Sequence, residues 1–227
     1  MISWIIPAYN EEKIIEHTLT KVTELLHGSD YEIIVSDDGS SDQTIKISKK
    51  FENVNVIKNL HTGRGGAVLN ALKEIHGDVV VLSSADIIFE KNFFLDLINK
   101  MKLVDVILLS KNLPSSNIYE RSKVRTITSK LFSKVTNKIF NLDYYDSEGA
   151  KIFKKSLVMH IVNKCRESGY LIDFEITLLA NRQGFKIIEM PWTLIDRQNL
   201  GILLKSGQII TSLLRIWKRD RNKHYAA

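Results

Sequence analysis

Four polar side chains follow apolar segments of the chain, and their chemical types suit the parts of an activated nucleotide. Tyr9 offers a flat ring for a base, and Asp38 can accept a hydrogen bond from a base N–H. Arg64 stands among glycines and can meet a phosphate. Asp86 offers the carboxylate oxygens that Mg²⁺ or Mn²⁺ prefers when the ion bridges a diphosphate. These residues predict a site for a metal-bound nucleotide diphosphate.

The elements that position these residues are expected to alternate between strand and helix. Short apolar segments predict strands, and most are followed by apolar residues at helical spacing. The strands are expected at residues 3–7, 32–36, 54–57, 78–83 and 104–109. This alternation predicts an α/β fold with a single, mostly parallel sheet flanked by helices. Because parallel strands end at one edge, polar residues that follow different strands are expected to converge there.

Further polar residues are expected at the same edge of the sheet. Asp37 precedes Asp38, although the pair taken alone also fits a strand that ends in an ordinary polar turn. Glu11 follows the first strand, where residues 10–12 are expected to begin a helix. Gly65 and Gly66 would let the backbone approach a ligand closely. The dinucleotide-binding and Walker-type phosphate motifs are absent from the sequence, so these two nucleotide folds are not expected.

Composition and charge narrow the possible partners. The 227 residues, 44% of them hydrophobic, suffice for one large domain with a proper core. The single cysteine, Cys165, excludes an intramolecular disulfide, and no signal peptide is recognisable, so we expect a cytoplasmic protein. Residues 111–138 carry seven Lys or Arg against one Glu, and residues 205–224 carry six against one Asp. These segments predict anionic partners, with solvated helix faces as the alternative; nucleic acid is not expected because stacking aromatics are lacking.

The motifs together resemble those of the family 2 glycosyltransferases, which have the GT-A fold. Residues 5–11 look like the opening strand and nucleotide-binding turn of that family, and residues 35–42 look like its second motif. Residues 63–67 fall where the family has a glycine-rich helix start. The resemblance implies a GT-A domain over residues 1–205, followed by a basic amphipathic helix and tail over residues 206–227.

The second half resembles the branch that contains dolichyl-phosphate mannose synthase and dolichyl-phosphate glucosyltransferase. Residues 110–112 occupy the place of its Gly-Ser-Arg, and residues 146–153 resemble its Asp-Thr-Gln-x-Gly-Phe-Lys-x-Phe segment. Residues 188–192 resemble the edge strand that follows, and residues 196–205 resemble the basic loop that closes over the diphosphate. The resemblance implies inverting transfer of a hexose from a GDP- or UDP-hexose to a polyprenyl phosphate, on the cytoplasmic face of a membrane.

The resemblance also implies which residues form the site. Asp86 would hold Mg²⁺ or Mn²⁺ and, with Arg197 and Lys205, would stabilise the charge that develops on the departing nucleotide diphosphate. The residues expected to bind the nucleotide sugar are Pro7, Tyr9, Glu11, Asp37, Asp38, Arg64, Ser84, Ala85, Asp86, Arg197 and Lys205.

One departure from the family pattern affects the metal site. The family has Asp-x-Asp where this chain has Ser84-Ala85-Asp86, so one carboxylate is missing. The metal would then be held less tightly or by another donor, or catalysis would be reduced. A nucleotide-sugar-binding protein with weak turnover is therefore an alternative to an active enzyme.

The acceptor decides whether a general base is needed. A lipid phosphate is already an anion and needs none, and the basic Lys111, Arg121 and Arg125 are expected to bind it. A hydroxyl on a glycan or another acceptor would need a carboxylate base, for which Asp146 and Asp173 are the candidates.

Two amphipathic helices are expected outside the nucleotide motifs. One places Val124, Ile127, Leu131 and Val135 on an apolar stripe among basic residues. The other, near the C-terminus, carries a stripe that ends in basic residues and is formed by Ile202, Leu203, Ile209, Ile210, Leu213, Leu214 and Trp217. Such helices can lie in a membrane interface, whereas core packing or a homodimer interface is the alternative. No apolar stretch reaches the ~18 residues that cross a bilayer.

Overall fold

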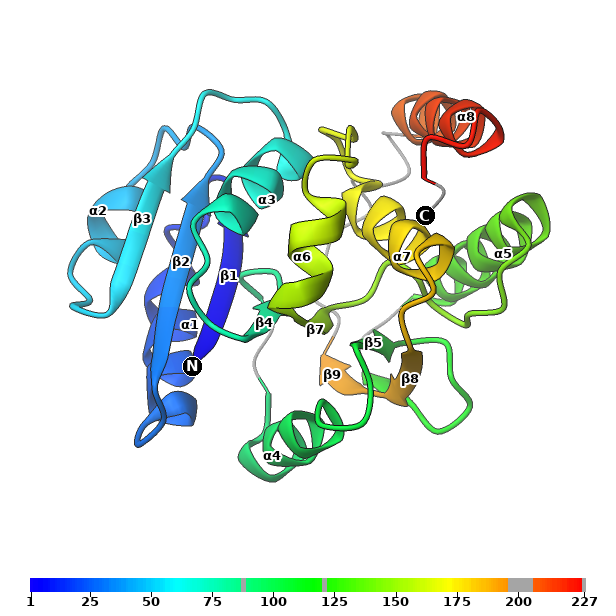
Figure 1. Ribbon diagram of the computed structural model, residues 1–227. Coiled ribbons are helices and arrows are strands. Elements are labelled where there is room, and N and C mark those ends of the chain that lie inside the picture. Colours follow the sequence, from blue (N-terminus) through cyan, green and yellow to red (C-terminus); the bar gives the residue numbers. More distant parts are fainter. Residues whose placement is uncertain (87–88, 120–121, 196–205, 226–227) are drawn as a thin grey trace.

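The computed structural model describes residues 1–86, 89–119, 122–195 and 206–225, and it is built on a seven-stranded sheet (Figure 1). The strand order is β3-β2-β1-β4-β7-β5-β8, and every neighbouring pair is parallel except the two that involve β7. The predicted mostly parallel sheet is therefore confirmed. The strands are β1 (Ile2–Ala8), β2 (Tyr31–Asp37), β3 (Val54–Lys58), β4 (Val79–Leu82), β5 (Val106–Ser110), β7 (Lys151–Lys154) and β8 (Ile187–Pro191).

One face of the sheet is covered by α1 (Ile15–Leu26), α2 (Thr44–Ser48) and α4 (Lys91–Lys100). Trp4 of β1 is fully buried there, and its ring lies 5.4 Å from that of Phe94 in α4. The indole N–H of Trp4 donates to the Ser83 hydroxyl (2.9 Å), so the polar edge of this large ring is satisfied inside the core. This contact holds the end of β4 against β1.

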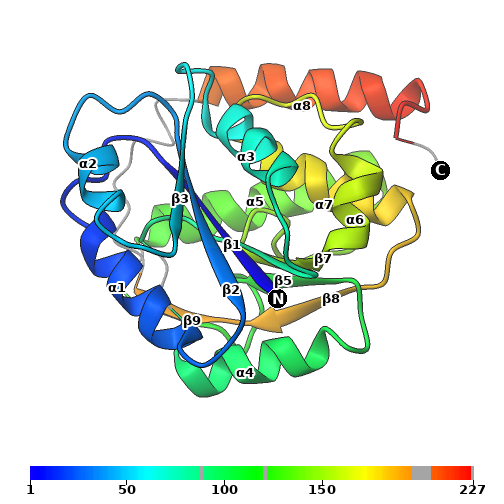
Figure 2. The same cartoon turned by 60° about the vertical axis from the view of Figure 1, so that its left-hand side comes forward.

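The other face is covered by α3 (Arg64–Lys73), α6 (Lys155–Ile161) and α7 (Ile172–Arg182). α7 is almost wholly buried because α5 (Lys123–Phe140) and α8 (Ser206–Arg221) pack on its outer side (Figure 2). The ring of Phe140 in α5 lies 5.0 Å from that of Phe174 in α7. A small parallel sheet of β6 (Asn117–Tyr119) and β9 (Thr193–Ile195) completes the described fold.

The C-terminal helix α8 is fixed to the domain by ion pairs as well as by apolar contacts. Arg182 of α7 makes two hydrogen bonds to Asp220, both 2.8 Å long. Arg219 pairs with the fully buried Glu175 at 3.0 Å, and the hydroxyl of Tyr225 donates to the same carboxylate. The predicted apolar stripe divides: its inward side packs on the core, whereas Ile210, Leu214 and Trp217 stay exposed. Ile202 and Leu203 lie outside the described residues.

The first helix begins later than the sequence pattern predicts. Residues 10–12 were expected to open it, but α1 starts at Ile15. Asn10 adopts φ 55°, a left-handed conformation that a helix cannot contain, because its backbone and side chain bond to the loop after β2. Contacts between two loops therefore override the local helix signal.

Candidate active site

The loops after β1 and β2 are joined by hydrogen bonds between the side chains of one and the backbone of the other. Asn10 N–H donates to the Ser40 hydroxyl (2.8 Å), and Ser41 N–H donates to Asn10 Oδ1 (2.9 Å). Glu12 N–H donates to Asp42 Oδ2 (3.0 Å). These bonds fix the backbone at the edge where the sequence places the nucleotide.

Asp37 is buried and shapes the turn that follows β2. Its Oδ1 accepts the backbone N–H groups of Gly39 (3.0 Å) and Ser40 (2.8 Å), and its Oδ2 accepts the Ser40 hydroxyl. Gly39 lies at φ 82°, which a side chain would strain. Asp37 thus acts on the loop, and its contact with a nucleotide stays a prediction.

Asp38 connects three strand ends. Its carboxylate accepts the N–H groups of Thr62 (2.9 Å) and Gly63 (3.0 Å from Oδ2), and its Oδ2 lies 3.1 Å from His61 Nδ1. His61 in turn packs against the half-exposed ring of Tyr9, with the centroids 4.6 Å apart and the rings tilted by 32°. Tyr9 and Asp38 therefore belong to one cluster, as predicted, but much of the hydrogen-bonding capacity of Asp38 is already used.

Gly65 and Gly66 were expected to let the backbone approach a ligand closely. In the structure they approach the segment before α7. The N–H groups of Gly65 and Gly66 donate to the carbonyl of Ser168, at 2.8 and 3.2 Å. A Cβ on Gly65 would stand 2.3 Å from the Glu167 carbonyl oxygen. These glycines therefore hold the segment before α7 against the start of α3, and that contact positions Arg64.

Arg64, at the start of α3, connects the loops that follow β1–β3 to α7 in the second half of the molecule. Its Nε donates to Asp173 Oδ2 at 3.0 Å, and both side chains are largely buried. Although burial opposes it, the negative charges of Asp173, Glu148 and Asp86 raise the pKa of Arg64. Arg64 is thus a permanent cation in a site rich in carboxylates.

Asp86 and Glu11 lie close enough to act on each other. Burial raises the pKa of the Glu11 carboxyl above its usual value, and the charges of Asp86 and Asp42 raise it further. Ala85 is buried, and its carbonyl accepts the hydroxyl of Thr18, which fixes the backbone before Asp86. These two carboxylates, one beyond the end of β1 and one beyond the end of β4, form a negatively charged site that a divalent cation would neutralise.

The donor set around Asp86 fits a divalent cation that is shared with a substrate. Within the described residues, no group of three or more His, Cys, Asp or Glu could hold a metal ion by itself. Mg²⁺ commonly binds one or two carboxylates and takes its other ligands from phosphates and water. Asp86 therefore fits as one ligand of a metal that arrives with a diphosphate.

Behind the strand ends lies a row of buried charges that the motifs only partly indicated. Lys151 is fully buried; its Nζ donates to the carbonyls of Ser147 (2.9 Å) and Gly149 (2.8 Å) and lies 3.9 Å from Asp173 Oδ1. Burial lowers the pKa of Lys151, and the surrounding carboxylates oppose this effect. The row contains Arg64, Asp173, Lys151, Glu148, Asp146 and Lys111.

Glu148 is the unusual member of this row. Its Oε1 is buried and has no hydrogen-bond partner within the described residues. Burial, followed by the charge of Asp173, raises the pKa of Glu148 to about 8. Asp146 differs because its carboxylate accepts the backbone N–H groups of Glu148 (3.0 Å) and Lys111 (3.2 Å).

A groove of about 650 Å³ begins at the Lys111 end of the row and runs along α5. Its lining includes the cations Lys111, Lys130 and Lys134 and the aromatic residues Tyr144 and Tyr145. The side chain of Lys111 reaches to 4.0 Å from Asp146 Oδ2, so the groove adjoins the buried charges. An elongated anion fits this lining better than a neutral ligand does.

The structure brings most of the predicted site residues to one edge of the sheet. Pro7 is buried inside β1 opposite Ser36, and Ser84 is half-buried after β4. Arg125 lies in the first turn of α5. Arg121, Arg197 and Lys205 lie outside the described residues.

His61, Lys151 and Glu148 were not among the predicted site residues. His61 lies beyond the end of β3, at the edge where the site forms. Lys151 and Glu148 appeared only as letters of a motif. Their position in a segment rich in acids was a signal that could have identified them.

Comparison with known proteins decides the family. The sequence profile of the family described as Glycosyl transferase family 2 matches residues 3–162. The chain belongs to that family. The resemblance found from the motifs is therefore confirmed, and so is the GT-A fold.

A solved structure has a similar fold. It is glucosyl-3-phosphoglycerate synthase from Mycobacterium tuberculosis, in complex with Mn²⁺, UDP-glucose and phosphoglyceric acid. It superposes with a TM-score of 0.71 at 19% identity, over 96% of this chain and 80% of that one.

Two related proteins are glycosyltransferases, and the name of the first places it in the expected branch. Dolichyl-phosphate beta-glucosyltransferase of Saccharomyces cerevisiae is 26% identical over 246 residues, which cover 95% of this chain and 73% of the yeast protein. Glycosyltransferase AglD of Haloferax volcanii is 25% identical over 202 residues, or 84% of this chain. This chain spans only 32% of the length of AglD.

Proposed function

We propose that this chain transfers glucose from UDP-glucose to a polyprenyl phosphate such as dolichyl phosphate, working from the cytoplasmic surface of a membrane. The names of the yeast relative and of the mycobacterial neighbour both favour a glucosyl donor. GDP-linked hexoses remain the second donor class, because an acidic residue beside an aromatic ring suits guanine as well as uracil.

The observation that carries the proposal is the groove beside the buried charges. Lys111, Lys130 and Lys134 offer three cations to an acceptor, next to the residues expected to hold the sugar nucleotide. A phosphate needs this positive lining and needs no general base. Asp146 and Asp173 support the same acceptor because both carboxylates are tied to partners: Asp146 accepts backbone N–H groups, and Asp173 pairs with Arg64.

The described residues would mainly position the two substrates. The half-exposed ring of Tyr9, which packs against His61, would receive the base, and Arg64 would supply a fixed positive charge near the diphosphate. Holding the acceptor phosphate in the groove beside the sugar makes the attack effectively unimolecular. Inversion follows from a single displacement by the phosphate oxygen.

A divalent metal, which we expect Asp86 to hold, would neutralise charge on the departing nucleotide diphosphate. Mn²⁺ or Mg²⁺ accompanies UDP or UDP-glucose in structures of the mycobacterial neighbour. Ser84 cannot replace the carboxylate that the family has at this position, so we expect weak metal binding in the absence of the nucleotide. Arg197 and Lys205 are proposed to add positive charge.

Transfer assays test the proposal directly. Radiolabelled UDP-glucose, GDP-mannose and GDP-glucose are each incubated with the chain, Mn²⁺ and a short-chain polyprenyl phosphate, and the label is followed into the lipid phase. Labelled lipid with UDP-glucose is the expected result, and Asp86→Ala should remove it. Nucleotide-sugar binding by calorimetry with no product from any acceptor would instead indicate a binding protein.

Glu148 supports a second candidate, a transferase that acts on a hydroxyl. A carboxyl group whose pKa is raised to about 8, and whose Oε1 lacks a hydrogen-bond partner within the described residues, could take a proton from an acceptor hydroxyl once it ionises near pH 8. The related branch has Gln at this place, which cannot act as a base. Glu148→Gln therefore separates the two candidates: transfer to a lipid phosphate should persist, whereas transfer to a hydroxyl should fall by about 100-fold or more.

A further inference from the structure

The helix α5 exposes an apolar stripe that runs along its full length. Five aliphatic side chains recur every three or four residues and are between 42 and 66% exposed: Val124, Ile127, Leu131, Val135 and Ile139. The opposite side of α5 is the one that packs on the domain, through Ser133, Thr136 and Phe140. Isolated apolar residues are normal on a protein surface, but five that form a continuous stripe indicate a surface that becomes covered.

The charges of α5 indicate what covers it. The helix contains five basic residues and no acidic one. At helical spacing, Lys123, Lys130 and Lys134 form one border of the stripe, and Lys138 lies within it. A lysine beside an apolar face can place its aliphatic stem on that face while its charge reaches an anion.

We propose that α5 lies flat on an anionic membrane, with the stripe in the acyl boundary and its lysines at the lipid headgroups. Only the purpose of this membrane binding, namely access to a lipid acceptor, rests on the proposed function. A second copy of the chain fits less well, because a symmetric pair would bring together two helices whose charged residues are all basic. The combination of an aliphatic face with a basic border is that of helices that bind membrane interfaces.

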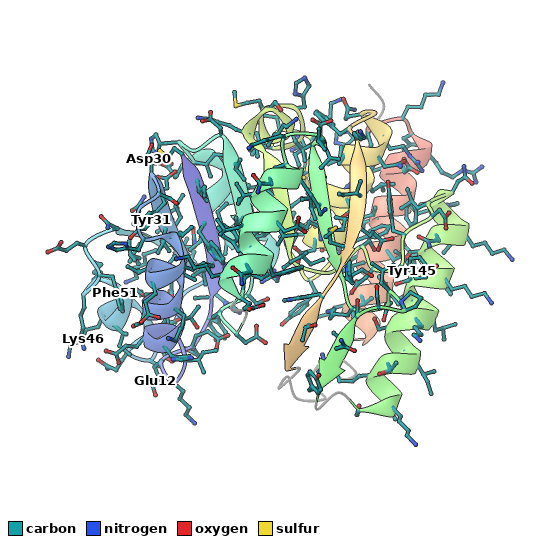
Figure 3. The ribbon with its side chains drawn as sticks, turned by 90° about the horizontal axis from the view of Figure 1, so that it is seen from below. Glu12, Asp30, Tyr31, Lys46, Phe51 and Tyr145 are labelled. Carbon is teal, nitrogen blue, oxygen red and sulfur yellow. The ribbon has the colours of Figure 1, made fainter. Side chains whose placement is uncertain are left out.

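The position of α5 places the acceptor groove at this membrane face. Lys130 and Lys134 border the stripe and also line the groove that begins at Lys111. Figure 3 shows Tyr145, another groove residue, on the side of the molecule where α5 lies. A lipid phosphate could then enter the groove from the headgroup layer without its chain leaving the bilayer.

The structure assigns this role to α5 in preference to α8, the other amphipathic helix that the sequence predicts. Ion pairs of Arg182 with Asp220 and of Arg219 with Glu175 hold α8 on α7, and part of the apolar stripe of α8 is buried. Its exposed residues include Leu214, which is 60% exposed. Leu214 therefore provides a matched control: an equally exposed leucine on a basic helix of the same chain.

Vesicle co-sedimentation with the full chain tests the assignment. The native chain should bind vesicles of phosphatidylcholine with phosphatidylserine, bind those of phosphatidylcholine alone less, and dissociate as salt rises. The double variant Ile127→Asp with Leu131→Asp should bind at least about tenfold more weakly, because two buried side chains are lost from the interface. Leu214→Asp should bind as the native chain does.

Three outcomes would overturn the assignment. One is unchanged vesicle binding by the α5 double variant, and another is an equal loss of binding in Leu214→Asp. The third is a double variant that binds vesicles as the native chain does but has a different oligomeric state, measured by sedimentation velocity without vesicles. That result would make the stripe a dimer interface. Thermal unfolding confirms that each variant is folded.

A separate assay distinguishes this failure from failure of the proposed function. The α5 double variant should still transfer glucose to a short-chain, water-soluble polyprenyl phosphate at the native rate, because Ile127 and Leu131 lie outside the expected site. Loss of vesicle binding with retained transfer supports both proposals. If the native chain binds vesicles but transfers no sugar, the membrane-binding role of α5 stands and the proposed transferase function is rejected.

Discussion

The two halves of the site use polar residues in opposite ways. Around β1 and β2, carboxylates and amides bind backbone N–H groups: Asp37 holds Ser40, Asp38 holds Thr62, and Asn10 holds Ser41. Behind β7 and α7, largely buried charged side chains also face one another: Asp173 pairs with Arg64 and lies 3.9 Å from Lys151. The first arrangement fixes loops in one geometry, whereas the second makes each charge depend on its neighbours.

This difference suggests a division of labour between the halves. A nucleotide is the same in every reaction cycle, so a rigid set of loops can bind it with little reorganisation. Under the proposed function, the acceptor half would receive an anion and release a product, so its charges would gain from being adjustable. Substitutions in the two halves would show whether the buried charges are interdependent in this way.

The largest expected effect comes from removing the buried cation. Lys151→Met takes away the fully buried positive charge that lies 3.9 Å from Asp173 Oδ1 and leaves Arg64 and Lys111 as the cations of the row. We expect a loss of about 3–5 kcal/mol in the free energy of unfolding, measured with urea. Lys154→Met on the same strand removes a partly exposed pair with Asp105 and should cost less than about 1 kcal/mol. Equal losses in the two variants would mean that the row has no special interdependence.

Next in size is a change at the contact that joins the two halves. Gly65→Ala would place a Cβ 2.3 Å from the Glu167 carbonyl oxygen, a backbone atom that cannot easily move. We expect a loss of about 2–3 kcal/mol in stability from the forced shift, together with weaker nucleotide binding as Arg64 moves.

The control for this prediction lies in α8. Gly207 has open space where its Cβ would be, so Gly207→Ala should change stability by less than about 1 kcal/mol. If Gly65→Ala is tolerated equally well, the segment before α7 is not held against α3 as tightly as the structure indicates.

The same contrast explains how much the sequence could predict. Hydrophobic patterning fixed the strands near β1, β2 and β4 because each is a short apolar segment that ends in polar residues. The convergence of Tyr9, Asp38, Arg64 and Asp86 followed from the parallel sheet, since strand ends meet at one edge. These inferences needed only local patterns and one rule of topology.

What the sequence could not give were pairings between distant residues. That Gly65 touches Ser168, that Arg64 pairs with Asp173, and that Lys151 is fully buried all depend on how α7 packs against α3 and β7. The two amphipathic helices could not be told apart either, because periodicity shows that a stripe exists but not which side of it meets the core. In α5 the stripe is exposed, whereas in α8 it is partly covered.

A smaller effect is expected at the C-terminus, which anchors the acceptor half. The hydroxyl of the buried Tyr225 donates to Glu175, a fully buried carboxylate that also accepts Arg219 and the backbone N–H of Arg166. Tyr225→Phe removes one of several donors, so we expect a loss of about 1–2 kcal/mol by urea unfolding. Tyr119→Phe, at a tyrosine that is 58% exposed, should stay within about 0.5 kcal/mol. An unchanged midpoint in Tyr225→Phe would show that Glu175 does not need this donor.

The most specific effect is a pH dependence due to Glu148. Its pKa is raised from 4.5 to about 8 in the folded chain, so between these values the folded state keeps a proton that the unfolded state has released. Stability therefore falls as pH rises through this window, with a slope of about 1 kcal/mol per pH unit or less. Other groups also titrate there, so the quantity to measure is the difference in the free energy of unfolding between the native chain and Glu148→Gln at several pH values.

That difference decides between two views of the acceptor half. If the native chain loses stability relative to Glu148→Gln as pH rises from 5 to 8, the carboxyl is held neutral by its surroundings, and ionising it works against Asp173 and Asp146. A flat difference would mean that Glu148 is already ionised at low pH and stabilised by Lys151, which would make the second half as fixed as the first. In that case an adjustable acceptor site would lose its physical basis, whereas the groove and its three lysines would still favour an anionic acceptor.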